Sequence, residues 1–196
     1  MSVTNNKIEI HKPIEQLSLF GYKNIFKSFI KIHEKQKLPN VILLNGSKGS
    51  GKATFAYHFS NYLLSKNEKD KYSIENQSIN PNSKTFNLIR SNVHPNFFLL
   101  DNDSKEDHIK IDRVRDLLKF LNKSTYHKGI KIVLIDNVEL LNKNSSNALL
   151  KALEEPGKET YFILINNNSY KILQTIKSRC IEFKIFFTVD EKKNIL

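Results

Sequence analysis

The 196-residue sequence contains a single cysteine, Cys180, and no long apolar run. One cysteine excludes a disulfide within the chain and a zinc site built from cysteines, and it is typical of a protein of the reducing cytosol. The longest apolar runs, 41–44, 97–100 and 132–135, are about four residues long, whereas a membrane-spanning helix needs about 20. Residues 1–12 are polar and have no apolar signal core. We therefore expect a cytoplasmic protein without a membrane segment.

Arginine is scarce in an otherwise basic sequence. The chain has 31 Lys and Arg against 20 Asp and Glu, a formal charge of +11, and its arginines are Arg90, Arg113, Arg115 and Arg179. This charge is typical of a protein that meets a polyanion such as DNA. Solvated lysine faces in a lysine- and asparagine-rich chain would give the same charge, so composition leaves both explanations open.

Basic residues gather around one expected helix and its exit. They are Lys110, Arg113, Lys119, Lys123, Lys128 and Lys131. Such a cluster could follow a phosphate backbone, but a solvated helix face explains it equally well. No ladder of aromatic side chains accompanies it to suggest stacking on single-stranded DNA.

Short apolar runs alternate with amphipathic segments along the whole chain. The sequence predicts strands at 41–45, 97–101, 131–136, 161–165 and 180–186. It predicts helices at 13–37, 52–65, 83–93, 111–121 and 144–155, and a polar loop at 66–81. This alternation indicates an α/β fold, a five-stranded parallel sheet sandwiched between helices. We expect one domain over 1–187, and 188–196 as the start of a further, truncated helical lid domain.

A glycine-rich turn follows the apolar run 41–44 and opens into a helix. Its residues are Gly46, Ser47, Lys48, Gly49, Ser50, Gly51 and Lys52. This is the layout of a phosphate-binding P-loop: the glycines let backbone N–H groups face an anion, and Lys52 can reach the outer phosphates. Ala53 stands where a hydroxyl normally binds Mg²⁺, and Thr54 lies about 100° further round the helix. We therefore expect a degenerate site that binds ATP and Mg²⁺ weakly or not at all.

Two other strand ends carry polar residues that suit this site. Asp136 ends the third strand, where a P-loop protein holds the Mg²⁺ shell, although a plain strand-end turn residue is the alternative. Asn137 stands where a Glu often activates the attacking water, and an amide cannot accept a proton at neutral pH. Asn167 follows the fourth strand and could sense a phosphate, or could belong to an asparagine-rich loop.

The triplet Ser178-Arg179-Cys180 places a rare arginine before the fifth strand. Where lysine fills nearly every basic position, an arginine suggests a task that needs a planar, bidentate donor. A local ion pair at the start of a strand is the alternative, and composition does not decide between them.

The chain resembles one family from end to end, the δ′ subunits of bacterial DNA polymerase III clamp loaders, in the AAA+ clan. The resemblance rests on Leu19-Phe20-Gly21, the 44–54 loop, His94-Pro95-Asn96, Leu134-Ile135-Asp136, the 147–156 stretch NALLKALEEP, Phe162-Ile163-Leu164 and Ser178-Arg179-Cys180. The NALLK-LEEP stretch and the SRC triplet are the most specific of these. The resemblance implies an AAA+ or RecA-like P-loop NTPase fold.

The same resemblance implies a role in loading the sliding clamp onto primed DNA. A δ′ subunit is usually a stator that does not hydrolyse ATP and lends its SRC arginine, here Arg179, to ATP on a neighbouring motor subunit. The implied partners are the motor and delta subunits, the clamp indirectly and primed DNA, within a DNA polymerase holoenzyme. No cofactor is required, and zinc is not expected because 66–93 lacks the cysteines of a zinc module. The family also implies lid and collar domains, so the chain looks like the N-terminal module of a longer protein.

Two other classes of function stay open. A self-sufficient P-loop ATPase would need a base where Asn137 stands, and a kinase would need an arginine-rich substrate lid that is not visible. A plain DNA-binding domain would act through its lysine surface and bind primed DNA in a salt-dependent way.

Overall fold

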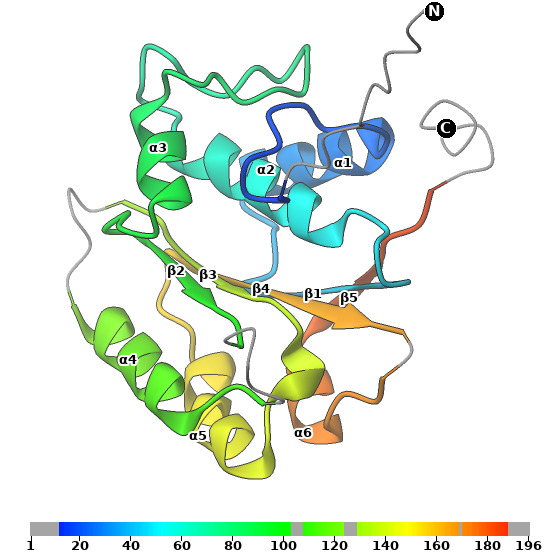
Figure 1. Cartoon of the computed structure of the whole chain (residues 1–196), viewed down its shortest axis with the longest axis vertical. Coiled ribbons are helices and arrows are strands. Elements are labelled where there is room, and N and C mark those ends of the chain that lie inside the picture. The colour runs from blue at the N-terminus through cyan, green and yellow to red at the C-terminus, as the bar shows by residue number, and fades with distance from the viewer. Residues whose placement is uncertain (1–11, 103–107, 124–128, 169, 188–196) are drawn as a thin grey trace, which may run out of the picture.

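A five-stranded, all-parallel sheet forms the centre of the computed structural model, which describes residues 12–102, 108–123, 129–168 and 170–187. The strand order is β2-β3-β4-β1-β5 (Figure 1). The strands are β1 (Val41–Gly46), β2 (Phe97–Leu100), β3 (Lys131–Ile135), β4 (Thr160–Asn167) and β5 (Ile181–Lys184). The predicted α/β fold with a parallel sheet is confirmed.

Helices cover both faces of the sheet. They are α1 (Lys23–Glu34), α2 (Lys52–Leu64), α3 (Lys84–Arg90), α4 (Ile111–Asn122), α5 (Lys143–Glu154), α6 (Gln174–Lys177) and the short 3₁₀ helix η2 (Val138–Leu140). Helices α1, α2 and α3 lie on one face, and α4, α5 and α6 lie on the other (Figure 1). Each face has its own apolar core, and β3 and β4 are buried along their whole length because both of their faces are covered.

The register of the strands brings their carboxyl ends to one edge of the sheet. Gly46 at the end of β1 lies opposite Asn167 at the end of β4, and Ile135 pairs with Leu164 and Leu100. The loops that follow β1, β2, β3 and β4 therefore meet at this edge. It is the edge at which ligands bind in open α/β sheets.

Helix α1 begins at Lys23, so the predicted helix from residue 13 is wrong over its first part. Gly21 and Tyr22 have φ angles of 69° and 57°, which a helix cannot continue through. The preceding segment instead forms a bridge from Ser18 to Ser78, and Leu19 packs into the core from outside the helix. Apolar spacing alone did not distinguish a helix from a turn that reaches the same core.

Other boundaries differ by smaller amounts. Asn142, rather than Asn144, caps α5, because its side-chain oxygen accepts a hydrogen bond of 2.9 Å from the backbone N–H of Ser145. Val93 lies beyond α3 and is exposed, and β5 is shorter than predicted. The segments η2 and α6 were not predicted, since each is a single turn. Residues 188–196, the expected start of a lid domain, lie outside the described residues.

Within the described part of the chain, no helix has the length and apolar character needed to cross a bilayer.

Candidate functional site

The loop between β1 and α2 has the shape that the glycine spacing predicts. Gly49 and Gly51 both have φ angles of 77°, in the left-handed region that glycine adopts without strain, and Gly51 immediately precedes α2. Gly46 lies so close to the residue that follows β5 that a Cβ atom there would stand 2.2 Å from the carbonyl oxygen of Ile185. The turn therefore needs glycine at 49 and 51 because of their φ angles, and at 46 because there is no room for a side chain.

Lys52 is buried in the first turn of α2 and folds back onto this loop. Its Nζ atom donates to the carbonyl oxygens of Gly46 at 2.9 Å and Ser47 at 2.6 Å, and it lies 3.4 Å from the hydroxyl of Ser50. Burial lowers the pKa of the ammonium group, while the charges of Asp136 and Glu139 oppose this shift. The lysine thus lies between the loop and the acidic residues of the site.

The remaining loop residues contribute unequally. Lys48 and Gly49 are exposed at the tip, with nothing within 4 Å of a Cβ placed on Gly49. Ala53 packs against the core on the α2 side and offers no hydroxyl. Thr54 is the next residue on α2, about 100° further round the helix, so it does not replace the missing group.

Three carboxyl groups gather at the ends of β2 and β3. The pKa of Asp136 is raised to about 6, chiefly by burial and also by the neighbouring charges of Asp101 and Glu139. The backbone N–H of Asn137, which donates to Asp136 Oδ1 at 2.9 Å, and the ammonium of Lys52 act in the opposite direction. Asp136, predicted as a site residue from its strand end, lies near Lys52 and these acids, whereas Asp101 and Glu139 were not singled out from the sequence.

Two asparagines link these acids. The Asn137 amide donates to Asp101 Oδ1 at 3.2 Å, and its oxygen accepts from Asn167 Nδ2 at 3.2 Å. Asn167 also donates to Glu139 Oε1 at 2.6 Å. Asn137 is therefore held as a donor to one acid and an acceptor from an amide. Asn167 lies at the site, as predicted from its strand end, but its described contacts are with these side chains.

Two aromatic rings cover the other side of the loop. The hydroxyl of Tyr22 donates to the carbonyl oxygen of Ser50, and its ring stacks on Phe187 with centroids 4.3 Å apart and an interplanar angle of 19°. Both rings come within 4 Å of a Cβ placed on Gly51. Neither ring is predicted as a site residue from the sequence. The one available signal was that Tyr22 directly follows the Leu19-Phe20-Gly21 motif.

Arg179 lies at the opposite edge of the sheet from the P-loop. It precedes β5, whose first residue, Ile181, pairs with Ile42 near the start of β1, whereas the P-loop follows the end of β1. The length of β1 therefore separates Arg179 from Lys52. The structure does not bring these two sequence-predicted site residues together.

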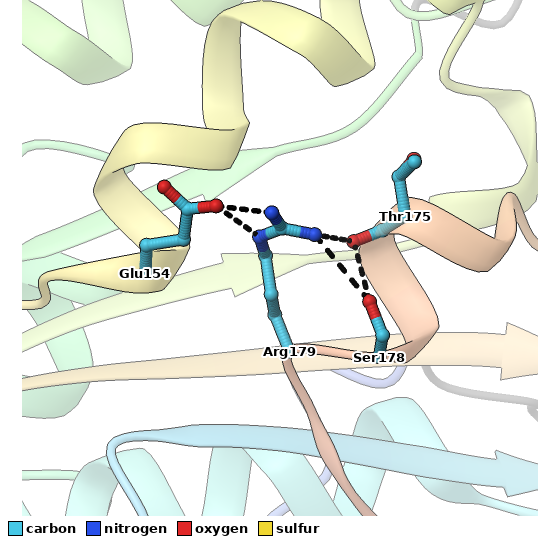
Figure 2. Close-up of polar contacts among 4 residues, drawn as sticks. All are labelled: Glu154, Thr175, Ser178 and Arg179. Atoms are coloured by element: carbon cyan, nitrogen blue, oxygen red, sulfur yellow. Dashed lines mark hydrogen bonds and ion pairs between the residues drawn. The ribbon is translucent and has the colours of Figure 1, made fainter.

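The guanidinium of Arg179 is held by residues of its own chain (Figure 2). Its Nε donates to Glu154 Oε1 at 2.9 Å and Nη2 pairs with the same oxygen, while Nη1 donates to the carbonyl oxygen of Thr175 at 2.6 Å. The local ion pair that the sequence left as an alternative is present. Cys180 beside it is half-buried, its Sγ lies 3.2 Å from the carbonyl oxygen of Ile176, and burial raises the pKa of its thiol to about 12.

The basic residues around α4 do not form one free phosphate-binding row. Arg113 donates to the carbonyl oxygen of Leu99 at 3.2 Å and lies over the ring of Phe98. Lys119 pairs with Asp116 on the helix surface. Lys131 is buried, and Lys128 lies outside the described residues.

The family model for DNA polymerase III, delta subunit, matches residues 21–187 of the chain, which include the P-loop, the acidic strand end and the SRC triplet. The chain belongs to this family.

Curated relatives agree with the family match. The DNA polymerase III subunit delta' of Pseudomonas aeruginosa is 36% identical over 140 residues, covering 71% of this chain and 41% of that protein. The protein of the same name from Buchnera aphidicola subsp. Schizaphis graminum is 31% identical over 160 residues, covering 82% of this chain and 47% of that protein. The chain thus spans less than half the length of these relatives.

A solved structure supports the assignment of the fold. The gamma subunit-related protein of DNA polymerase III from Thermotoga maritima superposes with a TM-score of 0.58 at 24% identity, covering 86% of this chain and 48% of that one. With the sheet order and the P-loop, this similarity confirms the predicted AAA+ P-loop fold. At this identity it shows the fold alone.

The two edges of the sheet therefore carry different chemistry. The carboxyl edge has a loop and a lysine that could hold phosphate groups, beside acids that could face a Mg²⁺ ion. It lacks a hydroxyl at Ala53, and the residue after Asp136 is an amide. The amino edge carries Arg179, whose guanidinium is held by Glu154 and Thr175.

Proposed function

We propose that the chain is the P-loop domain of a clamp-loader δ′-type stator, which donates Arg179 to ATP on a neighbouring motor subunit. The single observation that carries this proposal is the separation of Arg179 from its own P-loop by the length of β1. An arginine at that edge cannot serve a nucleotide at Lys52, but it can meet one bound to an adjacent protein. Family membership and the names of the relatives support the same role.

The P-loop of the chain itself supports little or no hydrolysis in this proposal. Lys52, Asp136 and Asn167 could contact phosphate or its metal, but the missing hydroxyl at Ala53 weakens Mg²⁺ binding. Asn137 cannot act as a general base, and its amide is already engaged with Asp101 and Asn167. Weak binding of ATP and Mg²⁺, without a required cofactor and without zinc, is therefore expected.

The partners in this proposal are the other subunits of the loader, namely the motor and delta subunits. The sliding clamp is met indirectly, and primed DNA is bound by the assembly. Because Arg113, Lys119 and Lys131 are engaged within the chain, α4 alone does not supply a strong DNA-binding surface.

The substitution Arg179→Ala in the reconstituted loader tests the proposal. An arginine finger contributes roughly 10³–10⁵ in rate at the site it serves, so hydrolysis at that site should be nearly abolished. The ATPase rate of the whole loader should then fall by the fraction that this site contributes. Assembly, measured by gel filtration, should be unchanged. Arg115→Ala is the matched control, since Arg115 is exposed and pairs only with Asp112 on α4 among its described contacts. An ATPase rate unchanged by Arg179→Ala would contradict the proposal.

A self-sufficient ATPase is the second candidate, and the surroundings of Glu139 favour it. Its Oε2 atom is buried and has no hydrogen-bond partner among the described residues, so it could accept a proton from water. A turnover assay of the purified chain with Mg-ATP separates the two candidates. We expect no significant turnover. Brisk hydrolysis that Glu139→Gln abolishes would favour this second function over the first.

A further inference from the structure

The contacts of Arg179 leave one end of its guanidinium open. Glu154 Oε1 accepts from Nε and Nη2, and Thr175 and Ser178 lie within reach of Nη1 (Figure 2). A guanidinium has five N–H donors, two of them on Nη2. One Nη2–H thus has no acceptor among the described residues, while the side chain is 25% exposed. The guanidinium is thus held through Nε, Nη1 and one N–H of Nη2, and the second N–H of Nη2 can still donate to a further acceptor.

The position of Glu154 is not explained by the preferences of its own helix. It is the last residue of α5, where the partial negative charge of the helix carboxyl end disfavours a carboxylate. Its neighbour Glu155 is also exposed, but no described contact joins Glu155 to Arg179. A residue that is unfavourable in its own element and paired with a specific partner suggests a role in function.

We propose that Glu154 is a positioning residue that fixes Arg179 for contact with a phosphate group of a nucleotide on a neighbouring subunit. This inference rests on the proposed function, because it needs Arg179 to meet that nucleotide. Glu154 and Thr175 hold the long side chain in one conformation before the phosphate arrives. Arg179 then has little rotamer freedom left to lose when it binds the phosphate, and its guanidinium already points in the direction from which it contacts that phosphate.

Two substitutions at Glu154 separate positioning from mere charge. Glu154→Ala removes the acceptor, whereas Glu154→Gln keeps an oxygen at the same reach and removes the charge. In the reconstituted loader, Glu154→Ala should lower kcat at the site served by Arg179 by about tenfold to a hundredfold, with little change in KM for ATP. Glu154→Gln should restore most of that rate, and Glu155→Ala, the matched control, should behave as wild type.

The outcomes distinguish this inference from the proposed function. If Arg179→Ala lowers the rate and Glu154→Ala does not, the positioning role is wrong and the arginine finger stands. If Glu154→Ala raises the rate, the pair is a restraining contact and the positioning role is again wrong. If Arg179→Ala itself has no effect, both proposals fail.

A measurement independent of activity checks the contact itself. The chain has four arginines, so its Nε–Hε NMR spectrum should contain four such signals, and Arg179→Lys identifies the one that disappears. The Arg179 Nε–H should exchange slowly with solvent in wild type and at least about tenfold faster in Glu154→Ala, because it loses its acceptor. Glu155→Ala should leave it unchanged. An exchange rate that is the same in wild type and Glu154→Ala would overturn the proposal.

Discussion

Asp136, at the end of β3, has a pKa raised to about 6, chiefly because burial disfavours its charged form and secondly because Asp101 lies near. An acid whose pKa is higher in the folded state contributes stability below its unfolded pKa of 3.8, and this contribution is lost as pH rises through about 6. At neutral pH the ionised Asp136 therefore destabilises the fold. Such groups are common at binding sites, where function keeps a charge that folding alone would not favour.

The substitution Asp136→Asn should stabilise the protein at neutral pH. The amide oxygen can still accept from the backbone N–H of Asn137, while the buried charge is removed. We expect the free energy of unfolding to rise by about 1–2 kcal/mol at pH 7.5 and to change little near pH 4. Urea unfolding at the two pH values measures this difference. A loss of stability at pH 7.5 would show that the carboxylate is favourably solvated.

Residues of the site differ in how far the sequence could predict them. Lys52 and Asp136 follow from local rules, because one ends a glycine-rich turn and the other ends an apolar strand. Tyr22 reaches the site only through the packing of a segment distant in sequence, and Glu139 reaches it through the single turn η2, which no local spacing indicates. Glu154, the carboxylate partner of Arg179, is likewise not indicated by local spacing, since it lies on a separate helix.

Among the elements, α4 has its carboxyl end capped by Lys131, a buried lysine at the start of β3. Lys131 Nζ donates to the carbonyl oxygens of Phe120 at 3.0 Å and Leu121 at 2.9 Å, and also to that of Lys123. The last carbonyls of a helix have no partner within the helix, and a cation is favourable at this end. The lysine therefore joins the end of α4 to the start of β3.

The substitution Lys131→Met should lower the free energy of unfolding by about 2–4 kcal/mol, because it leaves several carbonyl oxygens without their donor. Chemical denaturation followed by circular dichroism measures the change. Lys119→Met is the control: Lys119 is exposed and forms a surface ion pair with Asp116, so its loss should cost less than about 1 kcal/mol. Equal effects of the two substitutions would contradict a capping role for Lys131.

The strands were predicted better than the helices for a physical reason. A short apolar run between turns has few alternatives to a buried strand in an α/β sheet, so β1, β2 and β3 follow directly from their composition. Helix α2 was expected to be apolar on one face. It is buried on nearly every side instead, because the sheet, α1 and the 66–81 segment surround it. Burial of that kind depends on the fold as a whole.

Across the whole molecule, the buried His58 and the half-buried His94 act on stability in the opposite direction to Asp136. Burial lowers the pKa values of His58 and His94 to about 4 from 6.5. His58 contacts the hydroxyl of Tyr72 and a backbone oxygen, and His94 Nδ1 accepts from the backbone N–H of Asn96 at 3.1 Å. Both rings are therefore neutral in the fold. A depressed pKa gives stability above pH 6.5 that is lost as pH falls toward 4.

Lowering the pH from 7 to 5 should therefore reduce the free energy of unfolding. Each histidine contributes a loss of up to about 2 kcal/mol, and protonation of Asp136 offsets about 1 kcal/mol of the sum. In His94→Asn the asparagine oxygen can still accept from the Asn96 N–H, but no group titrates at that position. The decrease in the free energy of unfolding between pH 7 and pH 5 should therefore be smaller than in wild type by about 1–2 kcal/mol, which corresponds to about one pKa unit. Urea titrations at pH 7 and 5 test this, with the exposed His108→Asn as the control that keeps the wild-type decrease. If His94→Asn and wild type lose the same free energy over this range, His94 is already protonated in the fold at pH 5, and the link between its burial and acid sensitivity is wrong.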